Sequence, residues 1–321
     1  MQYQYFDAHC DTITKLYNKK TSLKCSNYMV NINHLKNYTN ASQVFAIYND
    51  GSLKKNDVLK MIKYFKNECN KYLSDISFVT NTKELQFCLR QGKIAALLSI
   101  EALGDEDDFD IDNINLYYKN GISIMGLCHN NDNILCGGIE NNSLGLTPLG
   151  IKVLRRMQSI GIILDVSHMS DKSFWEAASH WVLPFAATHS NSRSIYPHPR
   201  NLSDKQFVYL ASKGGICGIN FYPPFVNGKN SKIDDVISHI EHFMSLGGEN
   251  NICLGSDFDG IDFTVTDIDN ASFVYRLFDR LLAINYKESL VNKIAFNNFH
   301  NFIRKFETSS QKTCKITCNM L

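Results

Sequence analysis

The sequence has no long apolar run, no Cys-x-x-Cys pair and almost no net charge. Its 321 residues carry 33 Lys+Arg against 32 Asp+Glu, a net charge of +1. That balance gives no general attraction for nucleic acid or anionic lipid, so no nucleic-acid partner is expected. No stretch approaches the length of apolar residues that spans a bilayer, so no membrane partner is expected either. With 6 Pro, 18 Gly and 44% apolar residues, a collagen-like or disordered chain is excluded.

The 10 cysteines are scattered along the chain, and none of them forms a Cys-x-x-Cys pair. This spacing excludes a zinc ribbon, and the first residues show neither the basic nor the apolar segment of a secretion signal. We therefore expect free thiols and a cytoplasmic location. The sequence also has no Gly-x-Gly-x-x-Gly motif and no phosphate-binding loop after its first apolar run, which argues against nucleotide chemistry.

Short apolar runs alternate with longer segments of helical periodicity. Nearly continuous apolar character over four to eight residues is typical of strands buried on both faces of a parallel sheet. Eight such runs predict a single-domain (β/α)8 barrel of the TIM type over residues 1–306, with a doubly wound open sheet as the alternative. Residues 307–321 are predicted to form a polar, frayed tail. The predicted strands are 3–8, 43–47, 94–100, 122–128, 160–166, 184–188, 215–221 and 251–256.

One dense acidic run occupies residues 105–112. It lacks the ligand spacing of an EF-hand, so it does not predict a calcium site. A run of like charges of this kind is ordinarily exposed to water, and we expect a solvated loop.

Acidic and imidazole side chains stand at the ends of the predicted strands. In a (β/α)8 barrel, the active site is built where the carboxyl ends of the strands meet. One histidine at a strand end is more often a structural residue, but several at different strand ends indicate a common site. Seven potential ligands or acid/base groups are placed in this way: His9, Asp11, Glu101, His129, His168, His189 and Asp257.

Five of these residues have the chemistry of a metal centre. On the first strand, the period of two turns His9 and Asp11 to the same face, where both reach one ion. His168 and His189 would hold a second ion, and Glu101 would bridge the two. Imidazole and carboxylate ligands without thiolates favour two Zn²⁺ ions per chain, with Mn²⁺ or Co²⁺ as possible substitutes.

Nine short segments carry a further signal. They are 7–11, 99–101, 126–130, 145–150, 164–168, 187–191, 199–204, 218–221 and 255–260. In these segments the sequence resembles the membrane dipeptidase (renal dipeptidase) family, within the amidohydrolase superfamily. The segments occur in the family's order and cover roughly residues 3–306, and the ordered set is very specific. One departure follows Glu101, where the family usually has a Gly-rich turn and this chain has Ala102-Leu103-Gly104.

The resemblance implies a metal-dependent dipeptidase that acts on small peptides, and it leaves open whether a D-residue is accepted at the C-terminal position. It implies that His129 lies over the scissile carbonyl, that Arg200 binds the substrate carboxylate, and that Asp257 shuttles the proton. Asn220 and Tyr222 complete the residues that we assign to substrate binding. The resemblance also implies a homodimer.

The expected mechanism is hydrolysis by a hydroxide shared between two metal ions, with Asp257 as base and then acid. Two alternatives stay open: another amidohydrolase-type reaction, such as that of a deaminase or lactonase, and a non-catalytic metal-binding relative. Many of those other enzymes carry His-x-His on the first strand, where this chain has His9-Cys10-Asp11. That difference favours a dipeptidase.

Overall fold

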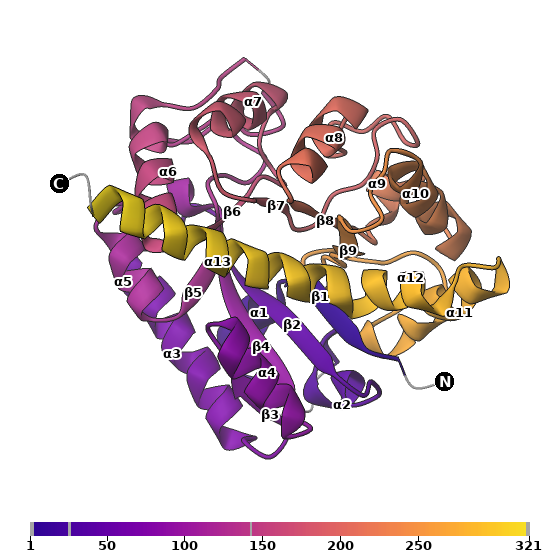
Figure 1. Cartoon of the computed structure of the whole chain (residues 1–321). Helices are drawn as coiled ribbons and strands as arrows, with labels where there is room; N and C mark the ends of the chain where they lie inside the picture. The colour runs from indigo at the N-terminus through magenta and orange to yellow at the C-terminus, as the bar shows by residue number, and fades with distance from the viewer. Residues whose placement is uncertain (1–2, 25–26, 142, 319–321) are drawn as a thin grey trace.

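Eight parallel strands close into a barrel in the computed structural model, which describes residues 3–24, 27–141 and 143–318 (Figure 1). The ring closes because β2 pairs with β1 on one side and with β4 on the other. This confirms the predicted single-domain (β/α)8 fold. The barrel strands are β1 (Tyr5–Cys10), β2 (Ala41–Tyr48), β4 (Ile94–Glu101), β5 (Ile122–Gly126), β6 (Ile163–Asp165), β7 (Ala186–Ala187), β8 (Ile216–Ile219) and β9 (Ile252–Leu254).

Each of the eight predicted apolar runs overlaps one of these strands, but one further strand is not predicted. The strand β3 (Ile76–Phe78) pairs with the beginning of β4, outside the closed ring. It is only 3 residues long, and only Ile76 in it is fully buried. Such a short and partly exposed segment lacks the continuous apolar character by which the barrel strands are predicted.

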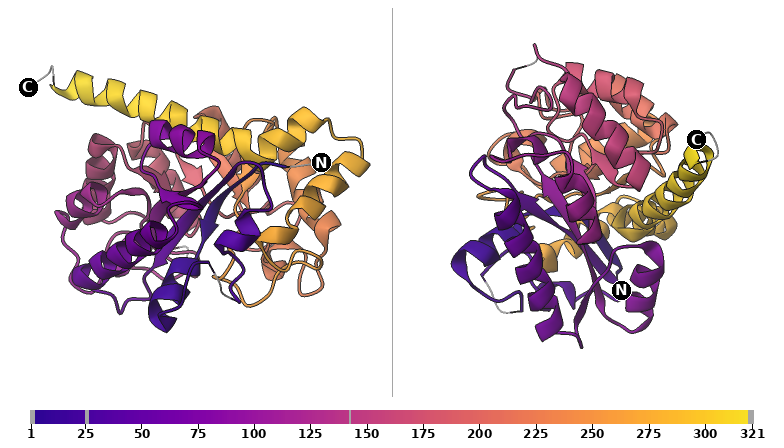
Figure 2. Two further views of the ribbon diagram at one scale, coloured as in Figure 1. Left: turned by 90° about the horizontal axis from the view of Figure 1, so that it is seen from below. Right: turned by 90° about the vertical axis from the view of Figure 1, so that its left-hand side faces the viewer.

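Helices surround the barrel and return the chain to the start of each next strand (Figures 1 and 2). Over the described ranges, none of them combines the length and the apolar character that crossing a bilayer requires. The helices are α1 (Thr12–Lys19), α2 (Ile32–Leu35), α3 (Lys55–Lys71), α4 (Thr82–Arg90), α5 (Asn113–Lys119), α6 (Pro148–Ile160), α7 (Asp171–His180), α8 (Asp204–Ser212), α9 (Pro223–Val226), α10 (Ile233–Ser245), α11 (Tyr275–Ala283), α12 (Glu288–Asn292) and α13 (Asn298–Cys318), with 3-10 turns η1 (Leu103–Asp105) and η2 (Ala271–Phe273) and a π-helical segment η3 (Lys293–Asn297).

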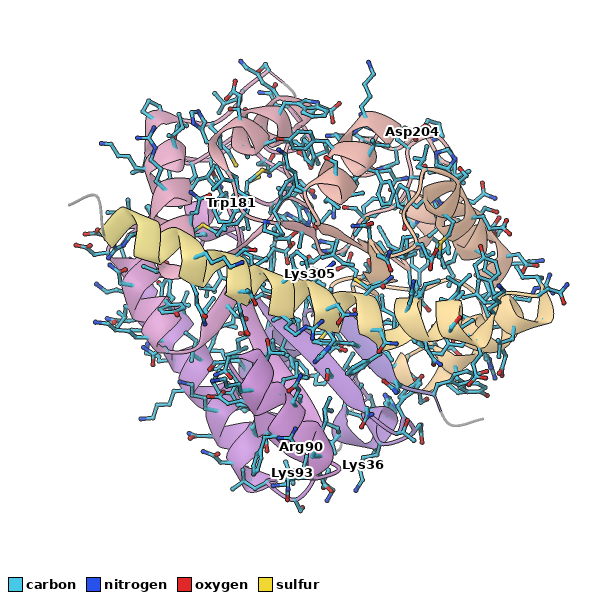
Figure 3. All side chains as sticks on the ribbon, in the orientation of Figure 1. Lys36, Arg90, Lys93, Trp181, Asp204 and Lys305 are labelled. Carbon is cyan, nitrogen blue, oxygen red and sulfur yellow. The ribbon has the colours of Figure 1, made fainter. Side chains whose placement is uncertain are left out.

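The expected frayed tail is instead a continuation of α13, which reaches Cys318. Glu307 accepts hydrogen bonds from the backbone N–H (2.7 Å) and hydroxyl of Thr82, and Ser310 is buried. Phe302 and Phe306 face the core, whereas Lys305 points outward (Figure 3). Over residues 307–312 the prediction of a frayed tail is wrong, because the contact of Glu307 with α4 and the burial of Ser310 hold the helix beyond residue 306. Residues 319–321 of the predicted tail lie outside the described residues.

The long helix α13 covers the amino-terminal end of the barrel. The Nδ2 atom of Asn298 donates to the carbonyl oxygens of Glu249 (2.9 Å) and Ile252 (2.8 Å), where β9 begins. In Figure 1 the helix crosses in front of the strands, and in Figure 2 it forms one edge of the molecule. The opposite end of the barrel, where the strands finish, is therefore the end at which a site can open.

The acidic run is only partly a solvated loop. Glu106 is 4% exposed, and it accepts hydrogen bonds from Asn113 Nδ2 (2.6 Å) and the Tyr117 hydroxyl (2.5 Å). Asp107 and Asp108 are exposed as expected. The expectation fails at Glu106 because this side chain turns inward to the start of α5, which a run of like charges in the sequence does not reveal.

Candidate metal centre

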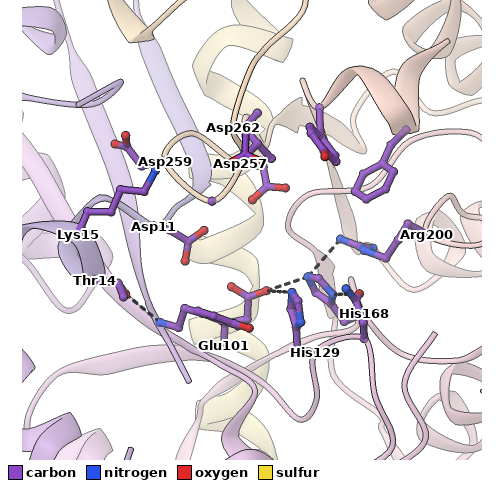
Figure 4. Close-up of a pocket in the computed structure, with 16 residues that line it drawn as sticks. Asp11, Thr14, Lys15, Glu101, His129, His168, Arg200, Asp257, Asp259 and Asp262 are labelled. Carbon is purple, nitrogen blue, oxygen red and sulfur yellow. Dashed lines mark hydrogen bonds and ion pairs between the residues drawn. The ribbon is translucent and has the colours of Figure 1, made fainter. Parts of the chain in front are cut away.

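A pocket of about 320 Å³ opens at the carboxyl ends of the barrel strands (Figure 4). It brings together residues that are up to 251 positions apart in the sequence, because each follows a different strand. Seven of its 16 lining residues carry an acidic or basic side chain, and aromatic rings lie beside them. The lining residues are Asp11, Thr14, Lys15, Tyr48, Glu101, His129, Asn130, His168, Arg200, Tyr222, Phe225, Asp257, Asp259, Gly260, Ile261 and Asp262.

The Glu101 carboxylate lies between two groups of candidate ligands. Its Oε2 atom is 3.3 Å from His9 Nε2, and its Oε1 atom is 2.8 Å from His168 Nε2. Oε1 is also 3.9 Å from His189 Nε2, while His9 Nε2 is 3.2 Å from Asp11 Oδ2. Glu101 therefore presents one oxygen to each group, which is the geometry that a bridging ligand needs.

The structure brings all five predicted ligands together at the floor of the pocket. Within each of the two predicted triads, a donor atom of every member lies within 4.8 Å of the others, and every member is buried. A third group meets the same criterion and includes Asp257. The groups are Glu101, His168 and His189; His9, Asp11 and Glu101; and His9, His189 and Asp257.

The hydrogen bonds of His168 and His189 show which ring nitrogens face the centre. His168 Nδ1 lies 3.0 Å from Asn130 Oδ1, an acceptor, so Nδ1 carries the hydrogen. His189 Nδ1 lies 2.9 Å from Thr188 Oγ1, whose own hydrogen is donated to the Asp165 carboxylate. Each ring therefore turns the lone pair of Nε2 inward.

These inward lone pairs make the cluster suited to a cation. His168 Nε2 and His189 Nε2 are 2.7 Å apart. Burial lowers the pKa of both imidazoles well below the ordinary value, with Arg200 adding to the effect at His168 and His9 at His189. Neutral rings with facing lone pairs beside a carboxylate repel one another unless a positive ion lies between them. The residues present therefore fit a bound metal ion.

Burial also perturbs the carboxyl groups of the site. It raises the pKa of Asp11 to about 6, and the nearby Glu101 carboxylate adds to this shift. The pKa of the Asp257 carboxyl is raised in the same way, to about 7. For Glu101, burial opposes ionisation, but His9 and His168 outweigh it and hold the pKa well below the ordinary value. The cluster thus concentrates negative charge that a divalent cation would neutralise.

Metal binding is expected to weaken as the pH falls through about 6. The Asp11 carboxyl takes up a proton over this range, and a protonated carboxyl has to release that proton before it can bind an ion. Titration of the metal-free protein with Zn²⁺ by calorimetry at a series of pH values measures the change in affinity and the protons released. An affinity that does not change between about pH 5 and pH 8 would contradict this assignment.

Three of the four predicted substrate residues line the pocket. They are His129, Arg200 and Tyr222. Asn220 instead is fully buried, donates from Nδ2 to Asp257 Oδ2 (2.9 Å), and accepts at Oδ1 from the Tyr222 backbone N–H (2.6 Å). Because both ends of its amide are occupied, the structure places Asn220 against Asp257 and away from the pocket surface.

Arg200 is held from both sides at the edge of the ligand cluster. Its Nη1 contacts the carbonyl oxygen of Ser167, and its Nη2 lies 3.3 Å from the carbonyl oxygen of His189. The guanidinium packs over the ring of Phe225 at 5.4 Å. Its buried Nε has no hydrogen-bond partner among the described residues. Nη2 also lies 3.2 Å from His168 Nε2, so the guanidinium is fixed in direction beside the ligand cluster.

The backbone is strained directly beside the candidate ligands. Ala102, which follows Glu101, has φ 62°, and Asp257 itself has φ 64°. Residues other than glycine adopt this left-handed region at a cost of about 1–3 kcal/mol, and such strain collects at functional sites. Gly260 has no room for a side chain, since a Cβ atom there would lie 2.3 Å from Asp11 Oδ2 and 2.6 Å from Asp257 Oδ1.

Several pocket residues are not predicted from the sequence, and most of them do not follow a strand directly. Lys15 lies one helical turn after Asp11 on α1, and Tyr48 ends β2 beside Glu101. Phe225 lies on α9, and Asp262 lies in the loop after β9. For Lys15 the signal was present, since α1 begins immediately after the predicted ligand Asp11.

The closed barrel and the buried imidazole and carboxylate groups at its mouth define the class as a metal-dependent barrel enzyme. The chain belongs to the membrane dipeptidase family (peptidase family M19), whose model matches residues 1–316. This confirms the family that the sequence resembles and makes the chain a metallo-dipeptidase.

Curated relatives agree with this family. A dipeptidase of Schizosaccharomyces pombe, described as uncharacterised, is 32% identical over 216 residues, which cover 64% of this chain and 51% of that protein. A dipeptidase of Claviceps purpurea is 26% identical over 266 residues, covering 80% of this chain and 62% of that protein. An uncharacterised protein of Klebsiella pneumoniae is 29% identical over 228 residues, or 67% of this chain and 83% of that protein. The chain thus spans between half and two thirds of the length of the two fungal dipeptidases.

Solved structures share the fold. A metallopeptidase from Rhodobacter sphaeroides, crystallised with a phosphinate mimic of the dipeptide L-Ala-D-Ala, superposes with a TM-score of 0.86 at 21% identity. The match covers 95% of this chain and 100% of that chain. The probable dipeptidase PvdM from Pseudomonas aeruginosa gives a TM-score of 0.84 at 14% identity, covering 95% and 96%.

Proposed function

We propose that the protein hydrolyses dipeptides with two Zn²⁺ ions held by the five predicted ligands. The observation that carries this proposal is the position of Glu101, with one carboxylate oxygen toward His9 and the other toward His168. Both ligand triads consist of imidazole and carboxylate donors, a set that suits zinc and also accepts Mn²⁺ or Co²⁺.

Asp257 is the proposed proton shuttle. When bound, a pair of metal ions supplies a water with a pKa lowered to roughly 7 and polarises the scissile carbonyl. Asp257 would accept the proton of the attacking water and deliver it to the leaving amine. Asn220 holds Oδ2 of this carboxylate, which leaves Oδ1 toward His9, 3.9 Å away, and the pocket.

His129 is the proposed donor to the oxyanion. Its side chain is 30% exposed at the pocket wall, and Nε2 lies 3.9 Å from Glu101 Oε1. Burial lowers the pKa of His129, so the neutral ring has one N–H to donate. Losing one donor to a developing oxyanion typically costs on the order of 10²–10³ in rate.

Arg200 is the proposed ligand of the substrate carboxylate. Its guanidinium lines the pocket and is oriented by two carbonyl oxygens and by His168 Nε2. A carboxylate placed there fixes the C-terminal end of a dipeptide, while Tyr222 and Phe225 form an apolar wall beside it. A longer peptide has no carboxylate at this position, so dipeptides would be preferred.

Replacing Arg200 with Lys is expected to raise KM for free dipeptides by about 10- to 100-fold, because Lys cannot form a bidentate pair with a carboxylate. The kcat value should change less. Steady-state kinetics on a dipeptide and its C-terminal amide measure the effect, and the amide should be insensitive to the change. Arg193→Lys is the matched control, since Arg193 pairs with Asp171 outside the pocket. Unchanged kinetics for the free dipeptide would overturn the role of Arg200.

Metal analysis combined with a substrate panel tests the proposed function as a whole. The panel contains L,L and L,D dipeptides, a tripeptide, a nucleoside and a lactone. Two Zn²⁺ ions per chain and turnover of dipeptides support the proposal, and the L,D arm decides whether D-residues are accepted. Turnover of the nucleoside or lactone alone would support the alternative amidohydrolase reactions. Metal binding without turnover of any substrate would support a non-catalytic relative. The homodimer and the cytoplasmic location stay predictions.

A further inference from the structure

Two buried aspartates lie directly beneath the candidate metal centre, and neither is one of the predicted ligands. Asp165 ends β6 and is 8% exposed, while Asp7 lies within β1 and is fully buried. Each accepts hydrogen bonds from the ends of two neighbouring strands. We call these two side chains, Asp7 and Asp165, the clamp carboxylates.

Asp165 joins the segments that carry His168 and His189. Its Oδ1 accepts from the Ser167 backbone N–H (3.0 Å), the Ser167 hydroxyl (2.6 Å) and the Thr188 backbone N–H (3.0 Å). Its Oδ2 accepts from the Thr188 hydroxyl. Four donors thus converge on this one side chain.

Through the Thr188 hydroxyl, Asp165 determines which ring nitrogen of the proposed ligand His189 carries the hydrogen. The Thr188 hydroxyl has one hydrogen, and the carboxylate is a stronger acceptor than an imidazole nitrogen. Thr188 Oγ1, 2.9 Å from His189 Nδ1, is then left as an acceptor, and His189 has to place its hydrogen on Nδ1. The lone pair of His189 Nε2 consequently points to the other ligands.

Asp7 makes the same arrangement on the other side of the centre. Its Oδ1 accepts from the backbone N–H groups of His9 (3.1 Å) and Ser256 (3.0 Å). Its Oδ2 accepts from the Ser256 hydroxyl and from the Tyr5 hydroxyl (2.9 Å). Asp7 thus joins the strand end that carries His9 to the one that carries Asp257.

We propose that Asp7 and Asp165 are positioning residues, each of which holds one half of the two-metal site and neither of which binds an ion itself. The inference rests on the proposed metal centre. Outer carboxylates of this kind typically change metal affinity by about 10- to 100-fold when they are removed. The two clamps should act on different ions, Asp165 on the one held by His168 and His189 and Asp7 on the one held by His9 and Asp11.

The most direct test is the pair Thr188→Val and Thr188→Ser. Valine keeps the shape and loses the hydroxyl, so Zn²⁺ affinity at one site should fall by about 10- to 100-fold, whereas serine should retain it. NMR of the ring nitrogens in the metal-free protein should show the His189 hydrogen leaving Nδ1 in the valine variant only. Equal Zn²⁺ affinity and an unchanged tautomer in both variants would overturn the proposal.

Asp165→Asn and Asp7→Asn test whether the clamps act separately. In place of the aspartate, asparagine presents an NH₂ group, which cannot accept the hydrogen bonds of the neighbouring hydroxyls. In Asp165→Asn the Thr188 hydroxyl then becomes free to donate to His189 Nδ1. Titration of each metal-free variant with Zn²⁺ against a chromophoric chelator should show one weakened step. Each variant is also combined with His168→Ala, which removes a ligand of one ion. In that background Asp165→Asn should change Zn²⁺ affinity little further, whereas Asp7→Asn should weaken it as much as it does alone.

Asp171→Asn is the control, since this aspartate bonds to Arg193 and Gln206 outside the pocket. It should change thermal stability without changing Zn²⁺ affinity. If Asp165→Asn and Asp7→Asn weaken both steps equally, the clamps act only on overall stability and the proposal fails. If the unmodified protein binds no Zn²⁺, it is the proposed function that fails.

A separate observation concerns Lys15, which lines the pocket on the side opposite Arg200, with Asp11 and Glu101 between them (Figure 4). No described residue forms a hydrogen bond or ion pair with its ammonium group. If Arg200 holds the C-terminal carboxylate, the N-terminal residue of a dipeptide extends across Glu101 and Asp11 toward Lys15. We infer, on the basis of the proposed function, that Lys15 selects dipeptides whose N-terminal side chain is a carboxylate.

Kinetics with Glu-Ala and Gln-Ala test this selectivity. Lys15→Met should lower kcat/KM for Glu-Ala relative to Gln-Ala by about three- to tenfold, as expected for a partly exposed ion pair. Lys19→Met is the control on the same helix, since Lys19 is exposed and does not line the pocket. An unchanged ratio together with normal turnover of Gln-Ala would overturn the role of Lys15 while leaving the proposed function intact.

Discussion

Replacing Glu101 with alanine is expected to remove bound metal and dipeptide hydrolysis together. The two oxygens of this carboxylate face different ligand groups, at 3.3 Å from His9 Nε2 and 2.8 Å from His168 Nε2. Without Glu101 each of the proposed ions would lose a ligand, and the buried imidazoles of His9, His168 and His189 would lose a neighbouring negative charge. Metal content after dialysis and kcat/KM on a dipeptide measure the two effects, and activity should fall by about 10³-fold or more, since metal-assisted attack and its charge stabilisation are lost together.

Two controls separate this expectation from simple misfolding. Glu106→Ala also removes a buried carboxylate, but one that bonds to Asn113 and Tyr117 away from the cluster, so it should lower stability and leave metal content unchanged. Glu101→Asp keeps the charge but shortens its reach, and should retain one ion better than two. If Glu101→Ala binds two Zn²⁺ ions as tightly as the unmodified protein, the carboxylate is not a bridging ligand.

The strand ends were predictable because polarity changes there over a single residue. A strand buried on both faces is a nearly unbroken apolar run, so the first ionisable group after it stands out, as at Glu101, His168 and His189. Parallel strands end at the same edge, so groups far apart in the sequence meet without further assumptions. This is why the five predicted ligands lie together in the structure.

Other features depend on contacts that leave no local pattern. Asn220 follows a strand just as the ligands do, yet both ends of its amide are occupied by Asp257 and Tyr222. Asp7 shares the strand face of His9 in the period-two pattern, but its donors come from Ser256 and Tyr5 as well as from His9 itself. Sequence reasoning finds which groups are placed at a site more readily than which partner each group has.

Replacing Asp257 with alanine is expected to leave both metal ions bound and to abolish turnover. Its Oδ1 lies 3.9 Å from His9 Nε2, farther than Asp11 Oδ2 at 3.2 Å, and its Oδ2 is held by Asn220. The ligand triads that include Glu101 remain complete without it. Loss of a general acid–base group costs about 10²–10⁴ in rate, which stopped-flow or steady-state kinetics at saturating metal measure.

The pH profile distinguishes a proton shuttle from a third metal ligand. As a base, Asp257 has to be ionised, so kcat/KM should rise with pH through its pKa, which burial raises to about 7 in the metal-free protein and which bound cations would lower. In the isosteric Asp257→Asn variant, the residual kcat/KM should no longer rise with pH over this range, while the metal content stays at two ions. Since Asp257 also belongs to a possible triad with His9 and His189, loss of one ion in both variants would instead show that it is a ligand. If the variants keep both ions and kcat/KM still rises with pH in the same way, the proton passes through another group.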